Sequence, residues 1–169
     1  GNDSLYGNNG EDTLTGGTGN DWLQGGHQSD TYIFEQGFGQ DVVHDSGWAS
    51  NSGADVIAFG PGIDPADLIV KKSGTDLILS FRGSEDSILL PNFISNSDNR
   101  VENFTFDDGT TFTDADLIAR AWTMTDADER IDGSYLADEM AGQGGNDSLY
   151  GNNGEDTLTG GTGNDWLQG

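Results

Sequence analysis

Large apolar residues recur with a period of nine near both ends of the chain, and an aspartate stands two positions before each of them. In the stretch GGTGNDWLQ, residues 16–24, glycines fill the first, second and fourth positions. Such a half-repeat favours a turn because glycine adopts positive φ at low cost. The last three residues favour a short strand whose apolar side chain faces inward. The period predicts a parallel β-roll, and its apolar position is filled in every copy, by Leu5, Leu14, Leu23, Tyr32, Met140, Leu149, Leu158 and Leu167.

The aspartates of the repeats predict calcium sites between stacked turns. Two nonapeptides complete one coil, so aspartates 18 residues apart should lie on the same edge, on strands stacked about 4.8 Å apart. Calcium takes six to eight oxygens at about 2.3–2.6 Å, so one ion fits between two turns. The expected aspartate pairs are Asp3 with Asp21, Asp12 with Asp30, Asp138 with Asp156, and Asp147 with Asp165. The expected ligands from the turns are Gly10, Gly19, Gly142, Gly144, Gly151, Asn153, Gly160 and Thr162.

A single motif of this kind would be explained as an ordinary turn or a flexible linker. Several copies in one register favour the calcium-binding roll instead. Two copies depart from the pattern, because Gln28 and Leu136 stand where glycine belongs, and we expect distorted turns and weaker sites there. Near residue 129 the pattern is degenerate, with Glu129 in the aspartate position.

These repeats resemble the repeats-in-toxin (RTX, haemolysin-type) family of secreted bacterial proteins. The resemblance covers about 1–33 and 133–169. The run GADVIAFGPGIDPADLIVKKSGTDLILSFRGSEDSILLPNF, followed by RVENFTFDDGTTFTDADLIAR, resembles the haemolysin-type calcium-binding related segment that often separates RTX blocks. The resemblance implies a parallel β-roll, type I secretion and calcium-triggered folding outside the cell or at its surface.

The middle of the chain has few glycines and several β-rich runs. We therefore expect an all-β fold in three parts: RTX repeats at 1–33, a less regular β segment at 34–123, and RTX repeats at 124–169. Strands are expected at 55–59, 68–72, 76–81, 87–90 and 101–106, with turns at 73–75 and 107–109. Helical segments are expected at 64–68 and 113–121. Because GFGQDVV at 37–43 echoes the nonapeptide, we expect the middle to stack in line with the roll and to carry most of the buried apolar surface.

The formal net charge of -24 argues against nucleic acid and anionic lipid as partners. The chain has no cysteine, and no apolar run approaches the roughly 18 residues of a membrane span. Its two histidines, His27 and His44, lie apart from any triad or zinc motif, and we expect no enzyme activity. Trp22 and Trp166 occupy outward positions, where they either stay exposed or pack on the next coil.

Residues 1–25 are identical to residues 145–169, including positions that the nonapeptide leaves free. We interpret this as one 144-residue block of a tandem array, with overlap; the alternative is a first segment copied to the end as a cap.

Two functions remain open. One is a calcium-dependent structural or adhesive block whose copies stack end to end; the other is an ancillary calcium module of a secreted enzyme or toxin. In both cases the metal-free rolls should be disordered, since their apolar core is thin and glycine-rich chains lose much entropy on folding.

Overall fold

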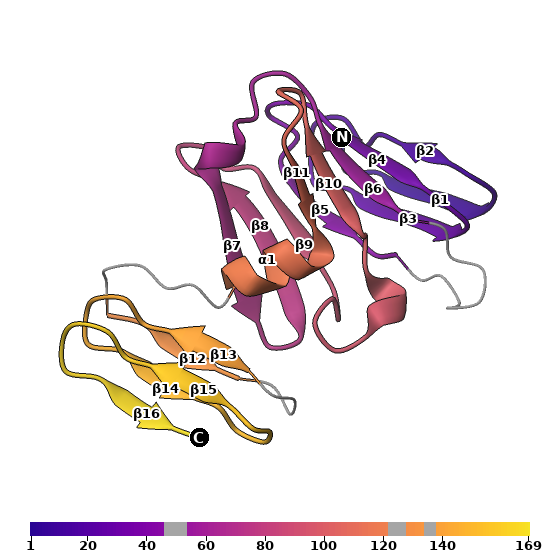
Figure 1. The fold of residues 1–169 in the computed structure, drawn as a ribbon. Helices are drawn as coiled ribbons and strands as arrows, with labels where there is room; N and C mark the ends of the chain where they lie inside the picture. Colours follow the sequence, from indigo (N-terminus) through magenta and orange to yellow (C-terminus); the bar gives the residue numbers. More distant parts are fainter. Residues whose placement is uncertain (46–53, 122–127, 134–137) are drawn as a thin grey trace. The chain divides into compact units, whose positions relative to one another are not determined.

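The computed structural model describes residues 1–45, 54–121, 128–133 and 138–169 (Figure 1). These residues form two compact units, Gly1–Ile118 and Ala119–Gly169. Apart from one short α-helix and two 3-10 helices, the regular elements of the described residues are strands, as expected for an all-β fold. No helix in the described part of the chain is long and apolar enough to cross a membrane.

The first unit contains two sheets whose central strands are stacked in parallel. The order of the first sheet is β1 (Ser4–Asn9), β3 (Trp22–His27), β5 (Gln40–Val43), β9 (Ser87–Leu90), β8 (Asp76–Phe81) and β7 (Leu68–Ser73). The order of the second sheet is β11 (Thr111–Thr113), β10 (Asn103–Phe106), β6 (Val56–Phe59), β4 (Thr31–Phe34) and β2 (Thr13–Leu14). From β1 to β6, successive strands belong alternately to the first and the second sheet, so each coil contributes one strand to each sheet; this is the topology of a β-roll (Figure 1).

The middle segment continues both sheets of the N-terminal roll, as the sequence predicted. Strand β5 pairs in parallel with β3, and β9 pairs in parallel with β5. In the second sheet, β6 pairs in parallel with β4, and β10 pairs in parallel with β6. Antiparallel hairpins end this stack, because β7 and β8 turn at Gly74 and β10 and β11 turn at Gly109.

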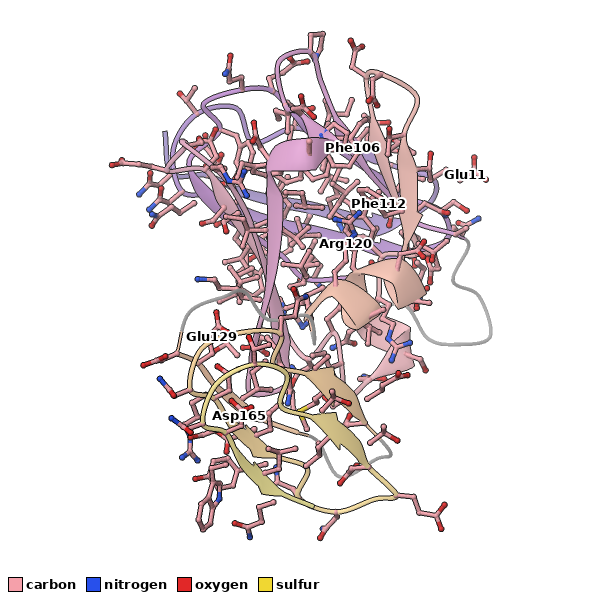
Figure 2. The ribbon with its side chains drawn as sticks, turned by 60° about the vertical axis from the view of Figure 1, so that its left-hand side comes forward. Glu11, Phe106, Phe112, Arg120, Glu129 and Asp165 are labelled. Carbon is pink, nitrogen blue, oxygen red and sulfur yellow. The ribbon has the colours of Figure 1, made fainter. Side chains whose placement is uncertain are left out.

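The hydrophobic core of the first unit lies mainly in the middle segment. Its strands β6, β8, β9 and β10 alternate between half-buried and fully buried side chains, so alternate residues face the core. Aromatic rings fill much of the core: Phe59 packs against Phe106 with ring centroids 4.7 Å apart. Phe106 and Phe112, both labelled in Figure 2, form an edge-to-face pair with ring centroids 5.8 Å apart. Each nonapeptide buries at most one large residue at its apolar position, so the middle segment carries most of the apolar burial, as expected.

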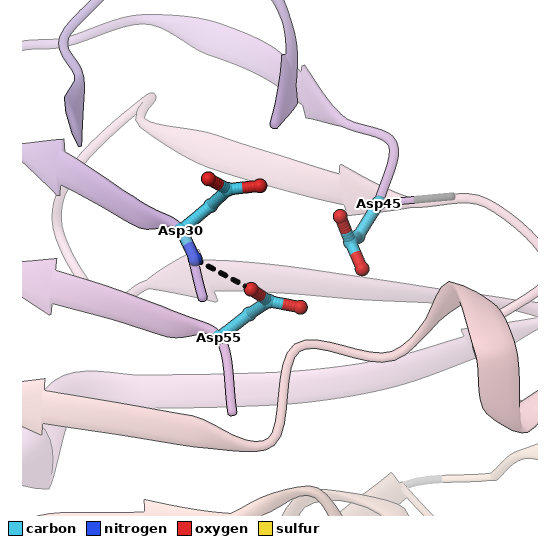
Figure 3. Close-up of side chains that lie close together, drawn as sticks. All are labelled: Asp30, Asp45 and Asp55. Carbon is cyan, nitrogen blue, oxygen red and sulfur yellow. Dashed lines mark hydrogen bonds between the residues drawn. The ribbon is translucent and has the colours of Figure 1, made fainter. Parts of the chain in front are cut away.

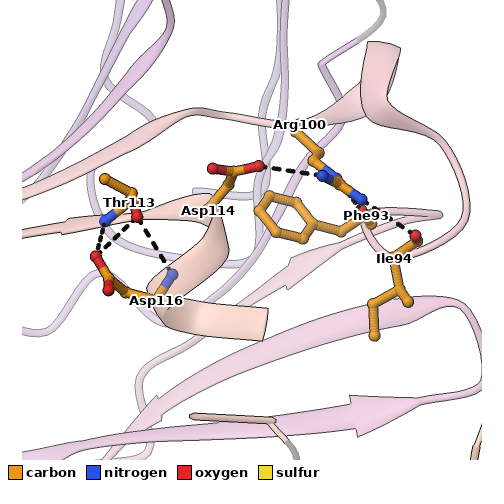
Figure 4. Close-up of polar contacts among 6 residues, drawn as sticks. All are labelled: Phe93, Ile94, Arg100, Thr113, Asp114 and Asp116. Atoms are coloured by element: carbon orange, nitrogen blue, oxygen red, sulfur yellow. Dashed lines mark hydrogen bonds and ion pairs between the residues drawn. The ribbon is translucent and has the colours of Figure 1, made fainter. Parts of the chain in front are cut away.

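Short polar motifs shape the connections in the middle. Asp64 caps the 3-10 helix η1 (Pro65–Asp67). Thr113 caps α1 (Asp114–Ala121): its Oγ1 accepts from the N–H of Asp116 at 3.2 Å, while its own N–H donates to Asp116 Oδ2 at 2.8 Å (Figure 4). This is a reciprocal capping arrangement. A second 3-10 helix, η2 (Ser97–Asn99), was not predicted, because its residues carry no strong sequence signal.

The second unit is a small regular roll. Strands β12 (Arg130–Asp132), β14 (Ser148–Tyr150) and β16 (Trp166–Gln168) form one parallel sheet. Strands β13 (Glu139–Ala141) and β15 (Thr157–Thr159) form the other. The coil period is 18 residues, and Leu149 and Met140 are its buried apolar residues. Arg130 lies over the ring of Tyr150, with its guanidinium carbon 4.2 Å from the ring centroid.

Candidate metal centre

The four aspartate pairs predicted from the 18-residue spacing lie on neighbouring coils. In each pair the backbone N–H of the first aspartate donates a hydrogen bond to Oδ1 of the second. The N···O distances are 2.6 Å for Asp3 to Asp21, 2.8 Å for Asp12 to Asp30, 3.0 Å for Asp138 to Asp156 and 3.1 Å for Asp147 to Asp165. Each carboxylate therefore bridges two coils through one oxygen and leaves the other oxygen for a different partner.

Hydrogen bonds of the same kind, from a backbone N–H of one coil to a carboxylate oxygen of the next, continue beyond the regular repeats. We call this series the carboxylate ladder. The additional pairs are Asp21 to Asp41 at 2.7 Å, Asp30 to Asp55 at 2.7 Å, Asp55 to Glu102 at 2.7 Å and Glu129 to Asp147 at 3.0 Å. The position predicted for Glu129 is confirmed. Asp41, Asp55 and Glu102 were not predicted as members of this series, although each comes two positions before a buried apolar residue, as the repeat aspartates do. The 18-residue spacing does not identify these residues, because the coils here differ in length: the pairs are 20, 25 and 47 residues apart.

The second carboxylate oxygens of the ladder are suited to a hard cation. Buried oxygen atoms that accept no hydrogen bond within the described part of the chain are the Oδ2 atoms of Asp12, Asp21, Asp30, Asp41, Asp55 and Asp147. A buried, charged oxygen without a partner is costly, and calcium prefers carboxylate and carbonyl oxygens. The donor set therefore fits the calcium ions that the spacing predicted.

The first glycine of each repeat makes room for this oxygen. A Cβ on Gly7 would lie 2.6 Å from Oδ2 of Asp12, and one on Gly133 would lie 2.8 Å from Oδ2 of Asp138. The carboxylates of Asp147, Asp156 and Asp165 crowd the first glycine of their own repeats in the same way. The aspartate side chain thus lies across the turn, and only glycine leaves space for it. The glycines at this position in the affected repeats are Gly16, Gly25, Gly142, Gly151 and Gly160.

The other turn residues predicted as ligands also lie between coils. Gly10 and Gly19 have φ of 122° and 133°, and their N–H groups donate to carbonyls of the following coil. Gly142 and Gly151 donate to Thr159 and Gln168, and Gly144 pairs with Thr162. The Gly160 carbonyl faces Gly142, while Asn153 is exposed in its turn. Their role as calcium ligands stays a prediction.

The two departures from the pattern have different outcomes. Gln28 occupies the fourth position of its turn with φ of 80°, a left-handed conformation that is unfavourable for a residue with a side chain. Leu136 lies outside the described residues. Trp22 stacks on His44 of the next coil with ring centroids 5.6 Å apart, as expected if it packs on its neighbour. Trp166 is exposed, which is the other outcome expected for these outward positions.

Burial raises the pKa of several carboxyl groups in the ladder. The pKa of Asp41 rises to about 6, and burial also raises the pKa values of Asp30, Asp55 and Glu102. The backbone N–H bond that each receives from the previous coil opposes this rise. These groups therefore bind protons more readily than ordinary carboxylates do, and a bound cation would oppose this by favouring the ionised form.

The fold and the acidic ladder together define a calcium-binding parallel β-roll. Residues 1–23, 6–43 and 132–167 match the RTX calcium-binding nonapeptide repeat, and residues 76–116 match the haemolysin-type calcium binding protein related domain. The chain is therefore an RTX calcium-binding repeat protein with a central haemolysin-type calcium-binding related segment, and its metal is Ca²⁺.

One curated relative and one solved structure give further comparisons. The chain is 36% identical over 133 residues to the iron-regulated protein FrpA of Neisseria meningitidis serogroup C, covering 77% of this chain and 12% of that protein. The chain thus spans about an eighth of the relative's length. The crystal structure of extracellular lipase LipA from Serratia marcescens matches at 18% identity and a TM-score of 0.25, over 93% of this chain and 27% of that one.

Proposed function

We propose that this chain is a calcium-dependent structural block of a large secreted protein built from tandem copies, of the adhesin or filament type. Calcium binding and the β-roll are its established properties. The proposal adds that the block has no catalytic role and that it folds outside the cell after type I secretion. At millimolar calcium, sites with dissociation constants of about 10⁻⁴–10⁻³ M each add on the order of 1 kcal/mol. Several stacked sites are therefore needed, and inside a cell they contribute almost nothing.

The observation that carries the proposal is that the two copies of the 25-residue segment fold into the same coil. Both copies adopt the same register, with Ser4 opposite Trp22 in one and Ser148 opposite Trp166 in the other. In the second copy, β12 lies against β14, and Asp147 is only 1% exposed. In the first copy β1 is at the edge of its sheet, and the side chain of the corresponding Asp3 is 59% exposed.

The opposite ends of the two copies are complementary. Strand β3 is covered by β5, whereas the corresponding β16 is an edge strand. Each copy therefore has the neighbour that the other lacks. In an array of 144-residue blocks, strands β12 and β13 from one block would cover β1 and β2 of the next, and a single roll would run through the junction. Covering the edge strands in this way also prevents unwanted pairing with other chains.

An extended chain tests this arrangement. A copy of residues 122–144 is added before Gly1, which reproduces the sequence that precedes Gly145. In the second unit the N–H of Ser148 donates to the carbonyl of Glu129 at 2.8 Å, and the N–H of Thr157 donates to that of Asp138 at 2.7 Å. We expect the corresponding amides of Ser4 and Thr13 to become protected from hydrogen exchange in calcium, and we expect the exposed ring of Tyr6 to become covered.

The matched control is the same extension carrying Ile131→Asp and Met140→Asp, which places charges at the inward positions of the added coil. It should leave Ser4 and Thr13 exchanging as in the original chain. Unchanged exchange in both extended chains would overturn the tandem-roll proposal. Electron microscopy of the original chain in calcium tests a related consequence, because end-to-end stacking of separate molecules would give rods.

A second function is supported by the relative's size. Because the chain corresponds to 12% of FrpA, a block of this kind also fits an ancillary calcium module that assists export and folding of an enzyme or toxin. The length of the parent protein separates the two functions. Many consecutive 144-residue blocks would support the structural role, and a neighbouring catalytic domain would support the ancillary one.

A further inference from the structure

Three buried aspartates from three separate segments converge inside the first unit. Asp30 precedes β4, Asp45 follows the end of β5, and Asp55 precedes β6 (Figure 3). One carboxylate oxygen from each lies within 4.8 Å of the other two. Asp30 and Asp55 are 1% exposed and Asp45 is 2% exposed, so this cluster is closed off from solvent.

The hydrogen bonds of the ladder leave some carboxylate oxygens of this cluster without a partner. Oδ1 of Asp30 accepts from Asp12, and Oδ1 of Asp55 accepts from Asp30. Oδ2 of Asp30 and Oδ2 of Asp55 are buried, and no N–H or O–H group of the described residues donates to either atom. Figure 3 shows the carboxylates of Asp30 and Asp55 directed towards that of Asp45. Two buried carboxylates, each with one oxygen that accepts no hydrogen bond, thus lie beside a third.

Tyr32 holds the third carboxylate in place. This residue fills the apolar position that leucine occupies in most of the repeats, and its ring is fully buried. Its hydroxyl donates to Oδ1 of Asp45 at 3.3 Å and accepts from the N–H of Gly25 at 2.9 Å. A leucine here would leave Asp45 without this donor. The tyrosine therefore connects the nonapeptide turn to a residue that lies outside the repeats.

We propose that Asp30, Asp45 and Asp55 bind one calcium ion at a site that the nonapeptide pattern does not encode, and that this ion ties the N-terminal repeats to the central segment. The oxygens of one calcium sphere lie at most about 5 Å apart, twice the Ca–O distance, and the three oxygens here meet this limit. Magnesium demands shorter, near-octahedral bonds and dehydrates reluctantly, so calcium fits this closed cluster better. The proposal rests on the calcium-dependent folding described above and adds Asp45, which belongs to no repeat.

The location of the site gives it a specific structural effect. Asp30 and Asp55 lead into neighbouring strands of the second sheet, while Asp45 follows a strand of the first sheet. An ion held by all three joins the two sheets at the coil where the 18-residue period ends and the ladder spacing increases to 25 residues. The turn at Gln28, for which the sequence predicted a weaker site, belongs to this coil. A third carboxylate compensates for the irregular turn.

The test compares calcium stoichiometry in the full chain and in the variant Asp45→Asn. Native mass spectrometry at saturating calcium should find one ion fewer in D45N, with an unchanged far-ultraviolet circular dichroism spectrum. The exposed Glu85→Gln removes one negative charge elsewhere and should leave the ion count unchanged. Asp12→Asn should lose an ion of the repeats instead, so the D12N/D45N double variant should lose two.

Equal stoichiometry in the wild type and a folded D45N would overturn the site. If D45N does not fold, a crystal of the wild-type chain grown in calcium decides: electron density for an ion bonded to Asp45 confirms the proposal, and its absence there refutes it. The tandem-roll proposal is tested separately, because its extended chain can fail to protect Ser4 while D45N still loses an ion. A wild-type chain that binds no calcium at all would refute both.

Discussion

The backbone N–H of Asp21 donates a hydrogen bond to Oδ1 of Asp41 at 2.7 Å, although the residues are 20 apart rather than 18. The first aspartate belongs to a complete nonapeptide and the second to a segment that only echoes one. The bond therefore shows that the carboxylate ladder is a property of the coil and not of the exact repeat. It also joins the calcium-binding repeats to the segment that has its own apolar core.

Calcium removal should affect the second unit more than the aromatic core of the first unit. The second unit buries few large apolar residues, and its ladder carboxylates repel one another without metal. We expect residues 128–169 to lose protection from hydrogen exchange completely in chelator, while strands β6 to β10 keep part of theirs because of their aromatic core. Exchange measured by mass spectrometry with and without calcium checks this. Full protection of β14 and β15 in chelator would contradict it.

The sequence predicted the roll, the pairing of the repeat aspartates and the bounds of β8 and β9. These features depend on local rules: an 18-residue coil and alternation of apolar residues. The Asp30, Asp45 and Asp55 cluster could not be predicted in the same way, because the three residues follow no regular spacing in the sequence. Nothing local to Asp45 distinguishes it from a surface aspartate, and only the fold shows that it is buried beside Tyr32.

Leucine to alanine substitutions in the duplicated segment should have very different costs. Leu23 is fully buried, while Leu167, which occupies the same position in the second copy, is 42% exposed. Leu23→Ala removes core packing and should cost about 2–5 kcal/mol. Leu167→Ala should cost less than about 1 kcal/mol, because it leaves no closed cavity. Thermal unfolding of both variants in saturating calcium measures the difference, and equal losses would contradict the assigned burial.

Arg100 should stabilise the connection between η2 and α1. Its Nε donates to the carbonyl of Phe93 at 2.9 Å, and its terminal nitrogens contact the Ile94 carbonyl at 3.3 Å and Asp114 at 3.1 Å (Figure 4). Arg100→Ala leaves these acceptors unpaired and should cost about 1–3 kcal/mol. The exposed Arg82→Ala is the matched control and should change stability by less than about 0.5 kcal/mol. Chemical denaturation in calcium compares the two, and an equally small effect of R100A would show that the contacts contribute little.

The stability of the first unit should depend on pH in opposite directions with and without calcium. Burial raises the pKa of Asp41 to about 6 from an ordinary value of 3.8, so the folded metal-free chain favours its neutral form. The resulting stabilisation is complete below the unfolded pKa and is lost as pH rises through the folded pKa. Asp30, Asp55 and Glu102 are shifted in the same direction. Calcium reverses the dependence because it binds the ionised carboxylates and competes with protons.

In calcium-free buffer the first unit should therefore melt at a higher temperature near about pH 5 than near about pH 8, and in saturating calcium at a higher temperature near about pH 8. Aspartate to asparagine substitution at residue 41 is the control. The amide oxygen can still accept the Asp21 N–H but carries no titrating charge, so D41N should have a weaker pH dependence in calcium-free buffer. The same slope with and without calcium would mean that protons and metal do not compete for these oxygens.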